Sequence, residues 1–179
     1  MKIYLIGFSC SGKTTIGPKL AYKLSCSFYD LDDMISKKQN KTITGIFKDE
    51  GEKKFRAYET DILSGLSKRK ESFCVALGGG AFQSPKNQDI IENSGISVYL
   101  SCANDELYRR LKNQSDRPLL RDENSNQLSE SELKDKILSL MMKRKNNYLK
   151  ADIVCSTTDK TVEETVDEIY KKISLSATN

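Results

Sequence analysis

The sequence contains no histidine at any of its 179 positions. A histidine-ligated metal centre and a Ser–His nucleophilic mechanism are therefore both excluded, because each needs an imidazole. The cysteines are odd in number and form no C-x-x-C pair, which predicts reduced thiols that are mostly buried. They are Cys10, Cys26, Cys74, Cys102 and Cys155.

Long apolar runs and dense basic blocks are also lacking. No apolar run approaches the roughly 20 residues that cross a bilayer, so we expect no membrane partner. The net charge of +4 is spread over scattered lysines, so we expect no nucleic acid partner and favour an anionic small molecule. The chain moves directly into an apolar strand, which leaves no room for a signal peptide and predicts a cytoplasmic protein. Since no exposed apolar stripe is evident, we expect a monomer.

Strand-like and helix-like segments alternate along the chain, which predicts an α/β domain with a parallel sheet flanked by helices. Residues 1–179 show neither repeat nor linker and are expected to form a single domain. The predicted strands are about 2–6, 28–29, 73–77, 96–100 and 153–155. The predicted helices are about 13–24, 33–39, 43–50, 51–70 after a break at Gly51, 86–94, 104–112, 129–150 and a last one that begins at the capping box Thr161-x-x-Glu164.

The first strand leads into Gly7-Phe8-Ser9-Cys10-Ser11-Gly12-Lys13-Thr14, which matches G-x-x-x-x-G-K-[ST]. Between a strand and a helix, this spacing is typical of a loop whose backbone N–H groups cradle the phosphates of a nucleoside triphosphate. Lys13 would reach the β- and γ-phosphates, and the Thr14 hydroxyl would bind Mg²⁺. An accidental match in a Gly/Ser-rich turn is the weaker alternative. The predicted nucleotide-binding residues here are Gly7, Cys10, Ser11, Gly12, Lys13, Thr14 and Thr15.

Two further groups of residues follow predicted strands, at the sheet edge where open α/β folds bind ligands. Asp30 and Asp32 are expected to alternate on an extended stretch, one facing the phosphates and metal and the other facing an acceptor. The alternative is that they cap the next helix. Gly78, Gly79 and Gly80 predict either the close approach of another group or a positive φ, with a flexible turn as the alternative.

Three arginines are candidates for binding anionic groups. Arg117 lies in a polar segment, about 114–127, that we interpret as a mobile lid bringing a cation to the transferring phosphoryl group. Arg56 and Arg144 would suit a carboxylate, because a guanidinium group is a planar, two-pronged donor. Surface salt bridges are the alternative for this pair.

Together these features resemble the shikimate kinase family along nearly the whole chain. The matching segments are Ile6-Gly7-Phe8, Asp30-Leu31-Asp32, Phe55-Arg56-x-x-Glu59, Gly78-Gly79-Gly80, Arg117-Pro118-Leu119-Leu120 and Arg144-x-x-x-Tyr148. The resemblance implies a three-layer P-loop kinase fold with a five-stranded parallel sheet in the order 2-3-1-4-5. It also implies ATP and Mg²⁺ as cofactors, and shikimate as the acceptor that is phosphorylated on its 3-hydroxyl in aromatic amino-acid biosynthesis.

On the nucleotide side, the resemblance makes Thr14 the Mg²⁺ ligand, with Asp30 beside it. Arg110 resembles the arginine that stacks on adenine, and Arg117 resembles the lid arginine that reaches the phosphates. The loop after the last strand departs from the family, because Ser156-Thr157-Thr158-Asp159-Lys160 has neither the usual Arg nor the usual Pro. Its lysine is only a candidate for an adenine contact.

On the acceptor side, Arg56 and Arg144 resemble the clamp for the shikimate carboxylate, and Glu59 resembles the residue that orients Arg56. Asp32 resembles the residue that holds the ring hydroxyls and accepts the proton. The acceptor-binding helices would span about 32–70. The acceptor site would be lined by Gly78, Gly79 and Gly80, and the catalytic residues would be Lys13, Asp32 and Arg117.

Two other functions stay open on the sequence alone. A kinase for gluconate or a nucleoside monophosphate would leave Arg56 and Arg144 without a role. A non-catalytic nucleotide-binding subunit would not need the full set of loop, acidic and lid residues. Within the phosphate loop, Cys10 is predicted to be the reactive thiol of the chain, because a helix N-terminus and the neighbouring Lys13 favour a thiolate.

Overall fold

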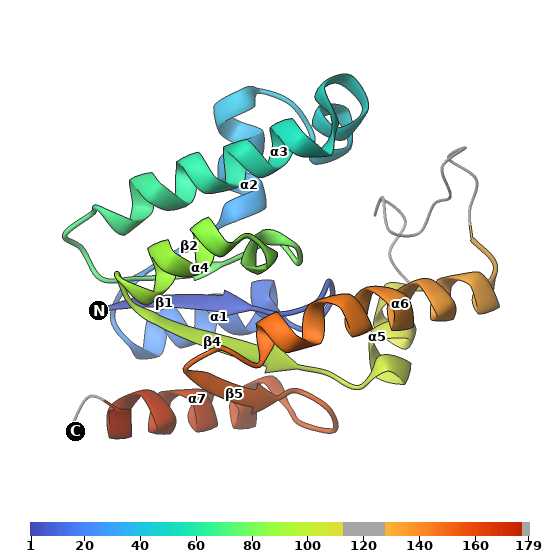
Figure 1. The fold of residues 1–179 in the computed structure, drawn as a ribbon. Helices are drawn as coiled ribbons and strands as arrows, with labels where there is room; N and C mark the ends of the chain where they lie inside the picture. Colours follow the sequence, from blue (N-terminus) through green and yellow to red (C-terminus); the bar gives the residue numbers. More distant parts are fainter. Residues whose placement is uncertain (113–127, 177–179) are drawn as a thin grey trace.

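The structure is a computed structural model that describes residues 1–112 and 128–176. One parallel sheet of five strands runs through it in the order β2-β3-β1-β4-β5 (Figure 1). The predicted fold class and strand order are therefore confirmed. The strands are β1 Lys2–Ile6, β2 Ser27–Asp30, β3 Phe73–Ala76, β4 Ile96–Ser101 and β5 Ile153–Ser156.

Helices flank the sheet on both faces and complete three layers (Figure 1). None of those in the described part combines the length and hydrophobicity that a membrane span requires. The helices are α1 Lys13–Lys23, α2 Leu31–Gln39, α3 Ile43–Ser67, α4 Pro85–Glu92, α5 Asn104–Leu111, α6 Glu130–Tyr148 and α7 Val162–Ser176. A short 3₁₀ helix, η1 at Ala81–Gln83, was not predicted.

The alternation of side chains along β1 explains why two separate cores form. Tyr4 and Ile6 join the core under α2 to α6, whereas Ile3 and Leu5 join the core under α1 and α7. Successive residues of a strand point to opposite faces, so a parallel strand covered on both sides is apolar at every position. β3 shows this fully, since each of its four residues is buried.

Local signals in the sequence fix several helix ends. Gly51 has φ 80° and ψ 168°, so α3 is interrupted there as predicted. Ser129 and Glu132 form a complete capping box at the start of α6.

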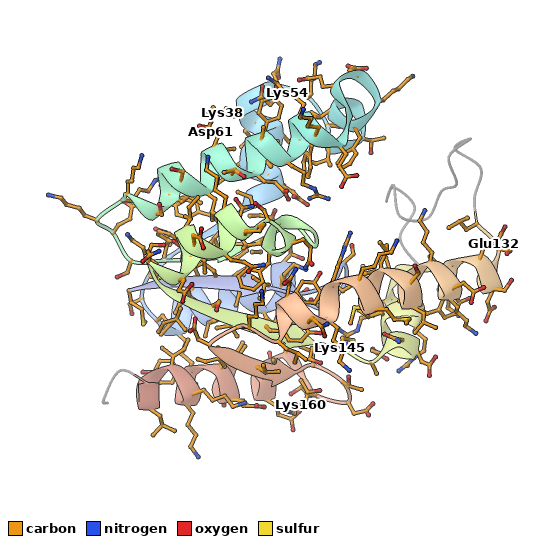
Figure 2. All side chains as sticks on the ribbon, in the orientation of Figure 1. Lys38, Lys54, Asp61, Glu132, Lys145 and Lys160 are labelled. Carbon is orange, nitrogen blue, oxygen red and sulfur yellow. The ribbon has the colours of Figure 1, made fainter. Side chains whose placement is uncertain are left out.

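Lys38 and Asp61, labelled in Figure 2, join α2 to α3 through a 2.6 Å ion pair. The predicted lid at 114–127, with Arg117, lies outside the described residues.

Candidate active site

The segment between β1 and α1, residues 7–14, is called the P-loop here and has the curled backbone that its glycines predict. Gly7 and Gly12 have φ values of 146° and 103°, and Cys10 between them has φ 62°. A Cβ at Gly7 would lie only 2.7 Å from the carbonyl oxygen of Leu100, so no larger residue fits. Lys13 Nζ donates across the loop to the carbonyl oxygens of Gly7 (3.0 Å) and Phe8 (2.7 Å), and the lysine is only 8% exposed.

A cavity of about 500 Å³ opens beside the P-loop, at the carboxyl ends of the strands. Such crevices are where open α/β folds bind their ligands. The sequence-predicted residues that line it are Cys10, Gly12, Lys13, Thr14, Thr15, Asp30, Asp32, Gly78, Gly79 and Arg110. Its lining within the described chain does not include Gly7, Ser11, Gly80, Arg56 and Arg144. Ser11 is fully buried, and its N–H donates to the carbonyl oxygen of Phe8 at 3.2 Å.

The two aspartates after β2 lie in the cavity wall, but one sequence expectation about them is wrong. Asp32 is in the first turn of α2 and not on an extended stretch. Asp30 caps this helix, because its Oδ1 accepts hydrogen bonds from the N–H groups of Asp32 (2.9 Å) and Asp33 (3.3 Å). Burial raises the pKa of Asp30, while the N–H of Asp33 and the charge of Lys13 act in the opposite direction. The capping alternative therefore holds for Asp30.

The three glycines after β3 are explained by close approach, since none of them has a positive φ. A Cβ at Gly78 would lie 2.6 Å from Glu59 Oε1 and 3.0 Å from Asp32 Oδ1. A Cβ at Gly80 would lie 2.5 Å from Nη2 of Arg56. Carboxylates and a guanidinium group are thus packed against the bare backbone, and a flexible turn does not account for the glycines.

Arg56 and Glu59 form the buried ion pair of α3. Glu59 is fully buried, and its Oε2 accepts a 2.7 Å hydrogen bond from Arg56 Nη1. Burial raises the pKa of Glu59 to about 7, with the charge of Asp32 adding to the shift and Arg56 opposing it. On its outer side, Arg56 donates from Nε and Nη2 to the exposed Glu52, at 3.2 and 2.8 Å. The surface salt bridge that was the alternative for Arg56 therefore accounts only for its pair with Glu52, and its pair with Glu59 is buried.

Arg144 and Tyr148 of α6 contact the segment Gly78–Gly80, called the glycine turn here. Arg144 is half-buried, with its guanidinium 5.6 Å from the centre of the Phe8 ring and its Nη1 3.2 Å from the carbonyl oxygen of Gly79. The Tyr148 hydroxyl donates to the same oxygen. The ring of Tyr148 stacks on Tyr99 with centroids 5.0 Å apart, and burial raises the pKa of Tyr148 to about 12. Arg144 therefore contacts the P-loop and the glycines after β3 from α6. Apart from the spacing of Tyr148 four residues after Arg144, nothing in the sequence predicted the contact of this tyrosine with Gly79.

Arg110 joins two loops at the far wall of the cavity. Its Nη1 donates to the carbonyl oxygen of Cys10 (3.3 Å), and its Nη2 donates to that of Thr157 (3.2 Å) in the loop between β5 and α7. Glu106 Oε1 holds Nε of Arg110 at 2.8 Å. Lys160, labelled in Figure 2, lines the cavity from the same loop and pairs with Glu168 at 2.5 Å. Lys160 was only a candidate for an adenine contact on the sequence, and Thr157 is a lining residue that the sequence analysis did not single out.

Three features of the site together define a class of protein. They are a P-loop with a nearly buried lysine, acidic groups at the end of the next strand, and arginines that face the glycine turn. The fold and this site are those of a P-loop kinase, which transfers a phosphoryl group from a nucleoside triphosphate.

Comparison with known proteins identifies the family within this class. The family model described as shikimate kinase matches residues 9–174. The chain is 42% identical over 171 residues to the shikimate kinase of Chlorobium chlorochromatii (strain CaD3), covering 96% of this chain and 90% of that one. Shikimate kinase from Acinetobacter baumannii, solved in complex with shikimate, has a TM-score of 0.87 at 33% identity, over 98% of this chain and 93% of that one. The enzyme from Bacteroides thetaiotaomicron also gives 0.87, at 28% identity over 97% and 98%.

The chain belongs to the shikimate kinase family. Its reaction is the transfer of the γ-phosphoryl group of ATP to the 3-hydroxyl of shikimate, which gives shikimate 3-phosphate and ADP on the route to aromatic amino acids. The alternatives of a gluconate or nucleotide kinase and of a non-catalytic subunit are set aside by this assignment.

Proposed function

We propose that this reaction takes place between two half-sites that meet at the carboxyl end of β3. The nucleotide half surrounds the P-loop, and the acceptor half is formed by side chains of α2, α3 and α6. The observation that supports this is the close approach of three consecutive glycines to the P-loop backbone on one side and to acceptor-side side chains on the other. Gly79 faces the P-loop, since a Cβ there would lie 3.4 Å from the N atom of Ser9, while Gly80 faces Arg56. Phosphates held by the P-loop N–H groups and Lys13 would thus end beside the acceptor.

We also propose that Thr14 and Asp30 hold Mg²⁺. Both side chains offer hard oxygen atoms to the same cavity, and Asp30 receives its two capping hydrogen bonds at Oδ1. Within the described chain, no cluster of three or more His, Cys, Asp or Glu side chains could hold a metal alone. This donor set fits Mg²⁺, which usually takes one or two protein oxygens together with substrate phosphates. When bound, the ion would neutralise charge on the phosphates.

On the acceptor side, we propose that Arg56 and Arg144 bind the shikimate carboxylate. The two guanidinium groups contact neighbouring glycines, Gly80 and Gly79, from different helices. Glu59 holds Nη1 of Arg56 from the buried side, which fixes the plane of its guanidinium. Asp32, which lines the cavity and lies against Gly78, would accept the proton of the reacting hydroxyl.

Three further parts of the proposal concern the chain as a whole. Arg117, outside the described residues, would reach the phosphates from the segment 114–127. Arg110 would contact the adenine base from the cavity wall. The enzyme would act as one cytoplasmic domain and as a monomer.

The test compares ADP release, with and without shikimate, for the wild type, Asp32→Asn and Asp33→Asn. Asp33 is the matched control, because it is exposed and lies one residue further along the same helix. Loss of a general base should lower the turnover of Asp32→Asn by about 100-fold or more, with little change in ATP affinity. Asp33→Asn should behave like the wild type. Equal losses of ATP binding and turnover in Asp32→Asn would place this residue with the nucleotide and contradict the proposal.

A further inference from the structure

Tyr148 is the last residue of α6, and its hydroxyl ends deep in the molecule. The residue is fully buried, and its ring is fixed by the stack on Tyr99. A buried phenol hydroxyl normally needs a hydrogen-bond partner. Its partner here is the carbonyl oxygen of Gly79, in the centre of the glycine turn. Tyr148 therefore connects a rigid aromatic pair to the backbone of the site.

The same carbonyl oxygen has a second donor, Nη1 of Arg144, at 3.2 Å. Arg144 precedes Tyr148 by four residues, so both side chains leave the same face of α6. A carbonyl oxygen has two lone pairs and can accept both hydrogen bonds at once. The two donors differ in mobility, because Tyr148 is packed on all sides while Arg144 is half-buried and long.

This difference matters when a carboxylate arrives. Hydrogen bonds between a guanidinium and a carboxylate are charge-assisted and stronger than those to a neutral carbonyl, so Arg144 would turn toward the ligand. Its Nη1 would then leave Gly79. Gly79 is half-buried in the cavity wall, and a part-buried carbonyl oxygen that loses its hydrogen bonds still costs free energy. With Tyr148 in place, the Gly79 oxygen keeps one hydrogen bond throughout.

We propose that Tyr148 is a positioning residue for acceptor binding. Its hydroxyl keeps the Gly79 carbonyl bonded, and this releases Arg144 to bind the acceptor carboxylate. The inference rests on the proposed role of Arg144 in the clamp.

A purely structural role for Tyr148 would have a different consequence. Gly79 also packs on the P-loop, since a Cβ there would lie 3.4 Å from the N atom of Ser9 and 3.6 Å from the carbonyl oxygen of Gly7. A loosened glycine turn would therefore disturb both the nucleotide and the acceptor. Loss of the Tyr148 hydroxyl alone, with the turn intact, would weaken only the binding of the acceptor.

The experiment measures the Kd values of shikimate and ATP by isothermal titration calorimetry for Tyr148→Phe and for Tyr4→Phe. Tyr4 is the matched control, because it is also fully buried and its hydroxyl bonds to Ser94 Oγ (2.7 Å), which is not a residue of the cavity wall. Tyr148→Phe should weaken shikimate binding about tenfold, corresponding to about 1.4 kcal/mol, and leave ATP binding within about twofold. Tyr4→Phe should change neither Kd, although both variants lose the hydrogen bond of a buried tyrosine and should unfold at lower temperature.

The inference is overturned if Tyr148→Phe binds shikimate like Tyr4→Phe, or if it weakens ATP and shikimate equally. Arg144→Ala separates this outcome from a failure of the proposed clamp. If Arg144→Ala binds shikimate as tightly as the wild type, then the clamp assignment itself is wrong. If Arg144→Ala loses shikimate and Tyr148→Phe does not, then the clamp stands and the role of Tyr148 falls.

Discussion

Gly80→Ala adds one methyl group directly against the guanidinium group of Arg56. The added Cβ would lie 2.5 Å from Nη2 of Arg56 and 2.7 Å from its Cζ and Nη1. Ordinary contact between such atoms needs about 3.5 Å, so the guanidinium must retreat by about 1 Å. Arg56 cannot retreat freely, because the buried Glu59 holds its Nη1 at 2.7 Å. The result is a displaced clamp in a protein that still folds.

A misplacement of about 1 Å in a binding group can cost about 100-fold in rate, or about 2.7 kcal/mol of transition-state stabilisation. We therefore expect Gly80→Ala to lower kcat/KM for shikimate by about this factor while the Kd of ATP stays nearly constant. A coupled assay of ADP release measures the first quantity and calorimetry the second.

Gly65→Ala is the matched control, because Gly65 lies in α3 and a Cβ there would meet nothing within 4 Å. This variant should keep full activity and gain about 0.5–1 kcal/mol of stability, since alanine favours a helix over glycine. Full activity of Gly80→Ala, or an equal loss of ATP affinity, would refute the reasoning.

Two other predictions concern ionisable groups of the site. The pKa of Glu59 rises from its ordinary 4.5 to about 7 on folding, so between these values the folded state binds more protons than the unfolded one. The free energy of unfolding should therefore fall as pH rises through this window, by up to about 3 kcal/mol. In urea titrations from pH 4.5 to 8, Glu59→Gln should flatten this pH dependence. An unchanged pH dependence in the variant would show that Glu59 does not titrate there. Cys10 lines the cavity and is half-buried, as is Cys26 outside it, whereas the other three thiols are buried. Iodoacetamide should modify Cys10 first, and ATP should protect Cys10 but not Cys26; labelling without preference or protection would contradict this.

The parts of the fold that were predictable are those determined by neighbouring residues. The apolar run Phe73–Ala76 could only be a strand covered on both faces, and the P-loop spacing fixed the junction of β1 and α1. The ends of β2 were harder to predict. β2 is an edge strand with no fully buried residue, so its apolar signal is weak, and the capping side chain of Asp30 starts α2 two residues earlier than expected.

The contacts that sequence reasoning missed join residues far apart in the chain. Tyr148 and Gly79 are separated by 69 positions, and Arg110 and Thr157 by 47. No local period encodes such pairs, because both partners are chosen by the packing of a helix or loop against the sheet edge. The glycines gave an indirect sign, since three missing side chains implied that other groups occupy their space.

The two cores on either side of the sheet divide the molecule for protein engineering. The side chains of the proposed acceptor half come from α2, α3 and α6, which pack on one core, whereas Ile169 and Ile173 of α7 pack in the opposite core. Sequence libraries aimed at heat tolerance could therefore vary the second half of α7 while leaving substrate recognition intact. Libraries aimed at a new substrate would be confined to the other layer, and the two searches could be run separately and their products combined.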